Sequence, residues 1–201
     1  MKLGIGAAQF GLDYGVSNTE GITPIAEAAK ILKQAELLGV EMIDTAPAYG
    51  NSETVLGSCI HDKHRYEIMT KTPFFDKDVI REQDVELLRK TFISSLRNLK
   101  QSSVYGLLIH HADDLFAVNG QKLWKSMEAL KDEGLVKKIG VSVYDAEQID
   151  ELLERYTVDL IQVPLNIFDQ RLLKSGHLKK MRDRQIEIHA RSIFLQGLLL
   201  M

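Results

Sequence analysis

The chain has 201 residues, of which 45% are hydrophobic, and its formal net charge is -3. This length and composition allow one sizeable core, so we expect a single domain over residues 1–201. Lys and Arg are spread along the sequence, which argues against nucleic acid or an anionic membrane surface as a partner and favours a small molecule.

Short apolar runs alternate with longer amphipathic segments along the whole chain, and this alternation is typical of βαβ units around a parallel sheet. The apolar runs predict seven strands, near residues 3–8, 42–44, 67–70, 104–109, 138–141, 160–163 and 186–190. The amphipathic segments predict helices near residues 24–38, 52–60, 79–99, 120–133, 146–155 and 171–184. No repeat or linker divides the series.

Local signals support the ends of these helices. Thr23 is predicted to cap the first helix, with Pro24 in its first turn. Gly39 and Gly134 fit positions just after a helix, where a left-handed residue is needed.

Alternating strands and helices leave two architectures open, a doubly wound sheet and a (β/α)8 barrel of the TIM type. The first turn, "GIGAAQFG", has Gly4, Gly6 and Gly11 at the wrong spacing for the dinucleotide-binding G-x-G-x-x-G. The loop over residues 9–22 is also long for a turn that cradles phosphate. The α/β barrel is therefore the favoured fold class, and its chemistry is expected after the carboxyl ends of the strands.

Ionisable side chains stand at three consecutive predicted strand ends. Asp44 ends the second run, Lys71 the third and His110 the fourth, and Tyr49 follows Asp44 in the short stretch "DTAPAY". Because burying a charge without a partner is costly, repeated charges at strand ends predict a shared site.

The four residue types have complementary chemistry. A tyrosine hydroxyl has a reference pKa near ~10, which is too high for efficient proton exchange at neutral pH without help. Lys71 could stabilise the phenolate of Tyr49, and Asp44 could orient Lys71. His110 could donate a hydrogen bond to a carbonyl oxygen as negative charge develops on it.

At this point the sequence resembles the aldo-keto reductase family, (β/α)8 barrels that pass a hydride between a nicotinamide cofactor and a carbonyl. The resemblance rests on "DTAPAYGNSE", "TK", "LLIHH", "IGVS", "LIQVPLN" and "ARSIFLQG", which occur in family order along nearly the whole chain. It implies Tyr49 as the general acid/base, with Asp44, Lys71 and His110 completing a catalytic tetrad. It also implies a carbonyl substrate in a pocket lined by Phe10, Phe74 and His111.

The resemblance further implies a cofactor site, with NADPH as the family's commoner cofactor and NADH as the alternative. Ser142 and Gln162 would meet the nicotinamide carboxamide, and Arg191 stands where many members have a ring-stacking aromatic residue. A planar guanidinium can also stack on a ring. The remaining cofactor-binding candidates are Gly6, Ala7, Ser192, Phe194, Gln196 and Gly197.

The sequence also departs from the family's pattern. Val143 replaces an Asn, and the chain stops at "QGLLLM", before the eighth strand and the segment that grips the adenosine end of the cofactor. We therefore expect an incomplete barrel of about seven strands whose first and seventh strands expose edges that favour self-association. Two other functions stay open: a catalytically silent barrel that binds a partner, and a barrel enzyme that uses Lys71 as a Schiff-base amine.

One further segment, "CIHDKH", contains the single cysteine Cys59 with His61 and His64. Its spacing matches no closed zinc site, so no metal is expected there. A lone cysteine excludes an internal disulfide, and the first residues lack the apolar core of a signal peptide. No apolar run approaches the roughly 20 residues of a membrane-spanning helix, so we expect a cytoplasmic protein.

Overall fold

A computed structural model describes residues 3–62 and 65–201. It contains one parallel sheet of seven strands in the order β1-β2-β3-β4-β5-β6-β7. The strands are β1 (Gly4–Gly6), β2 (Met42–Asp44), β3 (Glu67–Lys71), β4 (Val104–Ile109), β5 (Val136–Ser142), β6 (Leu160–Pro164) and β7 (Glu187–Arg191). The spatial order follows the chain order, whereas a doubly wound sheet reverses direction at a switch point, so the doubly wound alternative is wrong.

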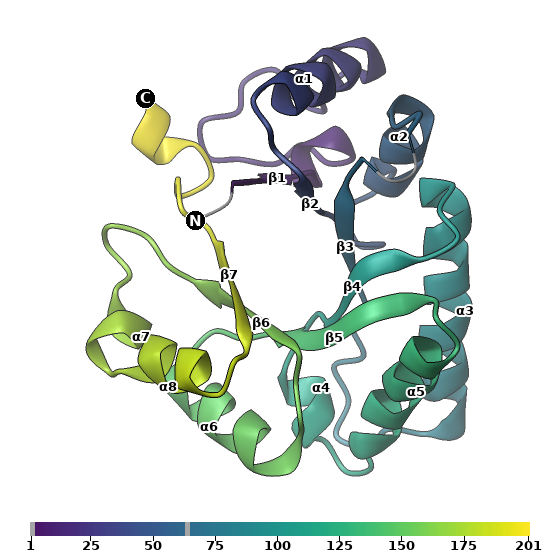
Figure 1. Cartoon of the computed structure of the whole chain (residues 1–201), viewed down its shortest axis with the longest axis vertical. Coiled ribbons are helices and arrows are strands. Elements are labelled where there is room, and N and C mark those ends of the chain that lie inside the picture. Colours follow the sequence, from purple (N-terminus) through teal and green to yellow (C-terminus); the bar gives the residue numbers. More distant parts are fainter. Residues whose placement is uncertain (1–2, 63–64) are drawn as a thin grey trace.

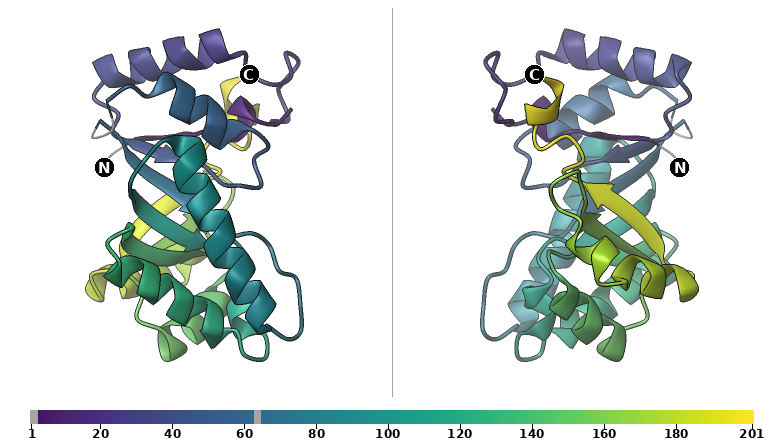
Figure 2. Two further views of the ribbon diagram at one scale, coloured as in Figure 1. Left: turned by 90° about the vertical axis from the view of Figure 1, so that its right-hand side faces the viewer. Right: turned by 90° about the vertical axis from the view of Figure 1, so that its left-hand side faces the viewer.

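The sheet curls, and the helices lie along its outer face (Figures 1 and 2). The helices are α1 (Ile25–Leu37), α2 (Ser52–Cys59), α3 (Glu82–Leu99), α4 (Asp113–Phe116), α5 (Gln121–Asp132), α6 (Ala146–Arg155), α7 (Arg171–Lys174) and α8 (His177–Asp183). Two 3-10 segments, η1 (Ala8–Phe10) and η2 (Leu198–Leu200), follow β1 and β7. The predicted class, an incomplete α/β barrel of the (β/α)8 type, is confirmed.

The alternation of side chains along each strand divides the apolar residues into two groups. Ile43, Leu107 and Val141 are fully buried in the large core that the sheet shares with the helices. A smaller cluster consists of Met42, Met69, Leu108 and Leu160. In the sheet register these four residues alternate with the first group, so the smaller cluster fills the concave side of the sheet.

The sheet has two edges within the part of the chain that the structure describes. There, β1 pairs with β2 and β7 pairs with β6, and the two edge strands do not pair with each other. Figure 1 shows them on either side of the opening in the curled sheet. No helix among the described residues is long and apolar enough to cross a membrane.

Several helix boundaries differ from those predicted. Pro24 itself occupies the N-cap position, with φ -58° and ψ 145°, so Thr23 lies outside α1 and makes no capping bond. Residues 79–81 are not helical because Val79 bridges Val118, and the Ile80 N–H donates to the Val118 carbonyl at 2.8 Å. The predicted helix over 171–184 is divided into α7 and α8, with the left-handed Gly176 (φ +82°) between them.

The glycine predictions at two helix ends are confirmed. Gly39 after α1 and Gly134 after α5 have φ values of +73° and +74°, a backbone conformation that residues with a Cβ rarely adopt.

Candidate active site

Three neighbouring strand ends and one turn place the predicted tetrad together. Asp44 is the last residue of β2, Lys71 is the last residue of β3, and His110 follows β4 directly. Tyr49 comes from the turn between β2 and α2. Because the carboxyl ends of parallel strands meet at one end of a barrel, the four side chains converge there.

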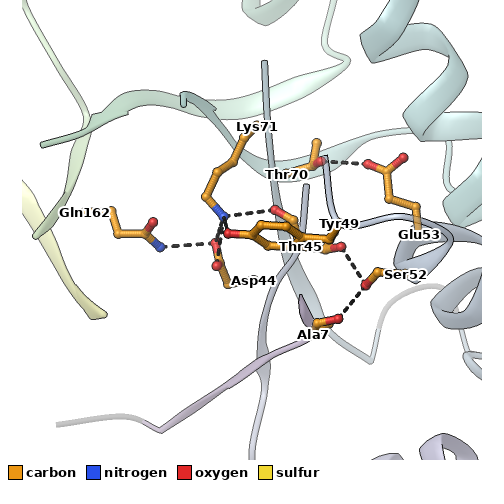
Figure 3. Close-up of polar contacts among 9 residues, drawn as sticks. All are labelled: Ala7, Asp44, Thr45, Tyr49, Ser52, Glu53, Thr70, Lys71 and Gln162. Atoms are coloured by element: carbon orange, nitrogen blue, oxygen red, sulfur yellow. Dashed lines mark hydrogen bonds and ion pairs between the residues drawn. The ribbon is translucent and has the colours of Figure 1, made fainter. Parts of the chain in front are cut away.

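Lys71 lies between Asp44, Thr45 and Tyr49 (Figure 3). Only 1% of its side chain is exposed, and Nζ donates to both carboxylate oxygens of Asp44 at 2.7 and 2.8 Å. Nζ also lies 3.0 Å from the carbonyl oxygen of Thr45 and 3.3 Å from Oη of Tyr49. The buried ammonium is thus fully hydrogen-bonded, which suits a fixed positive charge and argues against Lys71 as a Schiff-base nucleophile.

The environment of Tyr49 has opposing effects on its hydroxyl. Burial raises the pKa of Tyr49 above its ordinary value, and the nearby positive charge of Lys71 opposes that rise without cancelling it. The sequence suggested that Lys71 would make the phenolate accessible. In the structure burial dominates, so Tyr49 holds its proton at neutral pH.

His110 is the second group of the tetrad whose pKa is shifted. Burial, reinforced by the charge of Lys71, lowers the pKa of His110 to about 3, which keeps the imidazole neutral at physiological pH. Its ring stacks on Phe74 with centroids 4.0 Å apart and packs edge-to-face with the ring of Tyr49, with centroids 5.9 Å apart. Its Nδ1 atom is buried and has no hydrogen-bond partner among the residues that the structure describes.

The turn that carries Tyr49 is held against η1. Ser52 Oγ donates to the carbonyl of Ala7 at 2.7 Å and accepts from Thr45 Oγ1 at 3.0 Å (Figure 3). Gly11 approaches the turn so closely that a Cβ on it would lie 1.9 Å from the Tyr49 carbonyl oxygen. Backbone contact of this kind fixes the position of the tyrosine.

A cavity of about 770 Å³ opens beside the tetrad, and Asp44, Tyr49, Lys71 and His110 all line it. Eight of the predicted cofactor-binding residues line it too: Gly6, Ser142, Gln162, Arg191, Ser192, Phe194, Gln196 and Gly197. Gln162 Nε2 donates to Asp44 Oδ1 at 3.1 Å, which joins β6 to the tetrad.

The guanidinium of Arg191 lies over an aromatic ring at this cavity. Its guanidinium carbon is 4.2 Å from the ring centroid of Tyr144, and Nη2 donates to the carbonyl of Val143 at 3.2 Å. Within residues 3–62 and 65–201, the buried Nε atom of Arg191 has no hydrogen-bond partner. The guanidinium of Arg191, with its unused Nε–H donor, is therefore held in place at the cavity.

Four other predicted residues do not line this cavity. Ala7 is fully buried, and Phe10 belongs to the large core against the helices. Phe74 lies on the face of His110 instead. His111 lines a neighbouring cavity of about 820 Å³ between the loops that follow β3 and β4.

Sequence reasoning missed part of the lining. Tyr14, Gly15 and residues 17–20 come from the long loop after β1, and Tyr144 follows β5. The unusual length of that loop was the available signal, but no motif pointed to its individual residues.

The "CIHDKH" segment adds nothing to the site. Cys59 is partly exposed with its Sγ 3.8 Å from the carbonyl of Ile25, and His64 lies outside the described residues. Over residues 3–62 and 65–201, no three His, Cys, Asp or Glu side chains are grouped so that they could hold a metal ion.

A curled parallel sheet with ionisable side chains and a cavity at the carboxyl ends of its strands defines the chain as a protein of the α/β-barrel class. Its family follows from sequence comparison: the model of the Aldo/keto reductase family matches residues 2–201, so the chain belongs to this family.

Relatives are distant but consistent. The chain is 27% identical over 183 residues to the NADH-specific methylglyoxal reductase of Escherichia coli, covering 83% of this chain and 56% of that protein. It is 27% identical over 205 residues to the aldo-keto reductase YhdN of Bacillus subtilis, covering 98% of this chain and 61% of that protein. The structure of a glycerol dehydrogenase from Gluconobacter oxydans matches with a TM-score of 0.75 at 25% identity, and the match covers 98% of this chain and 61% of that one. The chain thus spans about three fifths of the length of these proteins.

Proposed function

We propose that the protein is an NAD(P)H-dependent oxidoreductase that reduces an aldehyde or a ketone. The observation that carries this proposal is the placement of Lys71 Nζ, within 3.3 Å of Tyr49 Oη and 2.8 Å or less of both carboxylate oxygens of Asp44, at the wall of a cavity. Membership of the Aldo/keto reductase family supports the same reaction class.

In this proposal Tyr49 is the general acid. Its raised pKa keeps the hydroxyl protonated at neutral pH, so the proton is available when the carbonyl oxygen gains negative charge. The phenolate left behind is stabilised by Lys71, whose own charge is balanced by Asp44. Neutral His110 donates a second hydrogen bond to the same carbonyl oxygen and so orients the substrate.

The cavity suits a nicotinamide dinucleotide, which when bound would supply the hydride to the carbonyl carbon. Its volume of about 770 Å³ is in the range of small-molecule sites. Arg191 offers a flat guanidinium and an unused buried donor, and Ser142 and Gln162 offer polar groups at adjoining strand ends. Ser192, Ile193, Phe194, Gln196 and Gly197 also line the cavity and would contact the rest of the cofactor. Family usage favours NADPH, and the NADH-specific relative makes NADH the alternative.

A panel of aldehydes and ketones, assayed with NADPH and with NADH, tests the proposal. Small 2-oxoaldehydes belong in the panel because one relative is a methylglyoxal reductase. We expect carbonyl-dependent oxidation of at least one cofactor. If purified protein oxidises neither cofactor with any member of the panel, the proposal fails.

A second candidate function is a silent barrel that associates through the edges of β1 and β7, each of which has one neighbour in the described sheet. Calorimetric titration of the protein with each cofactor, together with a measurement of the protein's molecular mass in solution, distinguishes the two candidate functions. Micromolar cofactor binding by a monomer favours the enzyme. A dimer that binds neither cofactor favours the interaction role.

A further inference from the structure

Phe74 combines two properties that rarely occur together. Its side chain is 52% exposed, yet its ring stacks on His110 with centroids 4.0 Å apart and an interplanar angle of 27°. The neighbouring Phe75 is buried in the large core, so Phe75 and not Phe74 accounts for the packing of this loop. Exposing an aromatic ring to water is unfavourable, and the main contact of the Phe74 ring is with the imidazole of His110.

The loop that carries Phe74 is fixed on both sides of it. On one side Thr72 donates its N–H to the carbonyl of Leu108 at 2.8 Å, and Thr72 Oγ1 accepts the N–H of His110 at 3.1 Å. On the other side the buried carboxylate of Asp114 accepts the N–H groups of Phe75 and Asp76, at 3.3 and 3.0 Å. These bonds hold the ring in place over His110.

The imidazole of His110 therefore contacts two aromatic rings, stacking on Phe74 and packing edge-to-face with Tyr49. We infer that Phe74 is a positioning residue that orients the His110 imidazole and shields it from water, so that His110 can donate to the substrate's carbonyl oxygen. This inference rests on the proposed function, because it assigns Phe74 a part in the same reaction.

The charged and titratable groups that face His110 act in the same direction as burial does, whereas its hydrogen bond with Thr72 acts the other way. Lys71 on β3, Arg191 on β7 and the adjacent His111 each disfavour a second positive charge, and the ring of Tyr49 packs edge-to-face with the imidazole. Burial is the largest contribution, and Phe74 supplies part of it. Removing the ring of Phe74 should therefore raise the pKa of His110 from about 3 toward its ordinary value, while the positive charges keep it from reaching that value.

The test is the titration of His110 by NMR of imidazole-labelled protein, in the wild type, Phe74→Ala, Phe74→Leu and Phe74→Trp, without cofactor or substrate. We expect His110 to titrate at a higher pH in the Ala and Leu variants and to keep the wild-type behaviour in the Trp variant, which retains a ring face. The matched control is Phe168→Ala, since Phe168 is exposed on another loop.

Turnover gives the second readout. We expect kcat to fall about 10- to 100-fold in Phe74→Ala and Phe74→Leu with unchanged cofactor affinity, and Phe74→Trp to recover most of it. An unchanged His110 titration in folded Phe74→Leu would overturn the inference, as would full kcat in that variant. If the wild type shows no turnover, the proposed function fails, whereas the NMR titration still decides whether Phe74 controls His110.

Discussion

At the scale of single residues, Lys71 has both a structural and a chemical part. Its ammonium is almost completely buried and depends on Asp44 for balance. Removing one partner of a buried ion pair leaves the other charge unpaired, which destabilises a protein more than replacing both.

Lys71→Met is therefore expected to lower the free energy of unfolding by about 3 kcal/mol, as is typical of a broken buried pair. The double variant Lys71→Met with Asp44→Asn should regain most of that stability, because no charge is left unpaired. Both the single and the double variant should lack turnover, since neither has the Lys71 ammonium that stabilises the phenolate of Tyr49. Urea denaturation and carbonyl-reduction assays on the same samples measure the two effects. Recovery of activity in the double variant would refute the role given to Lys71.

His110 predicts a pH dependence of stability. The pKa of His110 is lowered to about 3 in the folded protein and returns to its ordinary value of 6.5 on unfolding, so between these values the unfolded chain binds the extra proton. Stability is thus lost as pH falls below 6.5. At pH 5 the loss from His110 should be about 1–2 kcal/mol relative to pH 7.5. Measuring the free energy of unfolding of the wild type and of His110→Gln at both pH values isolates the loss that His110 causes. If the free energy of unfolding changed equally with pH in the two proteins, the neutral buried imidazole would be refuted.

At the scale of elements, the sequence predicted the strands better than the loops. Apolar runs identified all seven strands, and the charged strand ends identified Asp44, Lys71 and His110 because a core strand has no structural use for them. The Val79–Val118 bridge and the Asp114 carboxylate that holds residues 75 and 76 depend on contacts between segments far apart in the chain. Local patterns carry no information about such contacts, which is why the start of α3 and the position of Phe74 were missed.

The contact between η1 and the Tyr49 turn gives a prediction at this scale. In Gly11→Ala the new Cβ would overlap backbone atoms of Tyr49 and Ser52, which cannot move as a flexible side chain would. We expect a loss of about 1–3 kcal/mol in stability and a clear drop in kcat, because the turn must shift. Gly21→Ala is the control for kcat: Gly21 has no heavy atom within 4 Å of its Cβ position, and its positive φ (+73°), unlike the φ of -129° at Gly11, makes an alanine there strained for a different reason. A Gly11→Ala protein with wild-type kcat would show that this contact does not position Tyr49.

At the scale of the whole molecule, a polar network links strands that are not neighbours in the sheet. Glu187 on β7 accepts a hydrogen bond from Tyr105 on β4 at 2.7 Å and pairs with Lys138 on β5 and His189. These residues lie on the same curled sheet as the tetrad, closer to the amino ends of the strands. The network thus joins β7 to β4 and β5 through side chains.

The network predicts a loss of stability in acid. Burial opposes ionisation of Glu187, but the hydrogen bonds from Lys138, Tyr105 and His189 outweigh it and lower the pKa of Glu187 to about 2. Its contribution is therefore present above the ordinary value of 4.5 and is lost as pH falls toward 2. Glu187→Gln should lower the melting temperature at pH 7 by a few degrees and by much less at pH 2.5. An equal decrease at both pH values would contradict an ionic role for Glu187.

The central claim is hydride transfer to a carbonyl carbon with Tyr49 as the proton donor, and isotope transfer measures it most directly. Purified protein is incubated with an aldehyde substrate and with NADPH or NADH carrying deuterium at C4, each C4 position labelled separately, and the product alcohol is analysed by mass spectrometry. The account predicts deuterium on the carbinol carbon from one of the two positions in the wild type, and loss of product in Tyr49→Phe with cofactor affinity unchanged. Product without deuterium from either cofactor, or undiminished deuterated product from Tyr49→Phe, would contradict it.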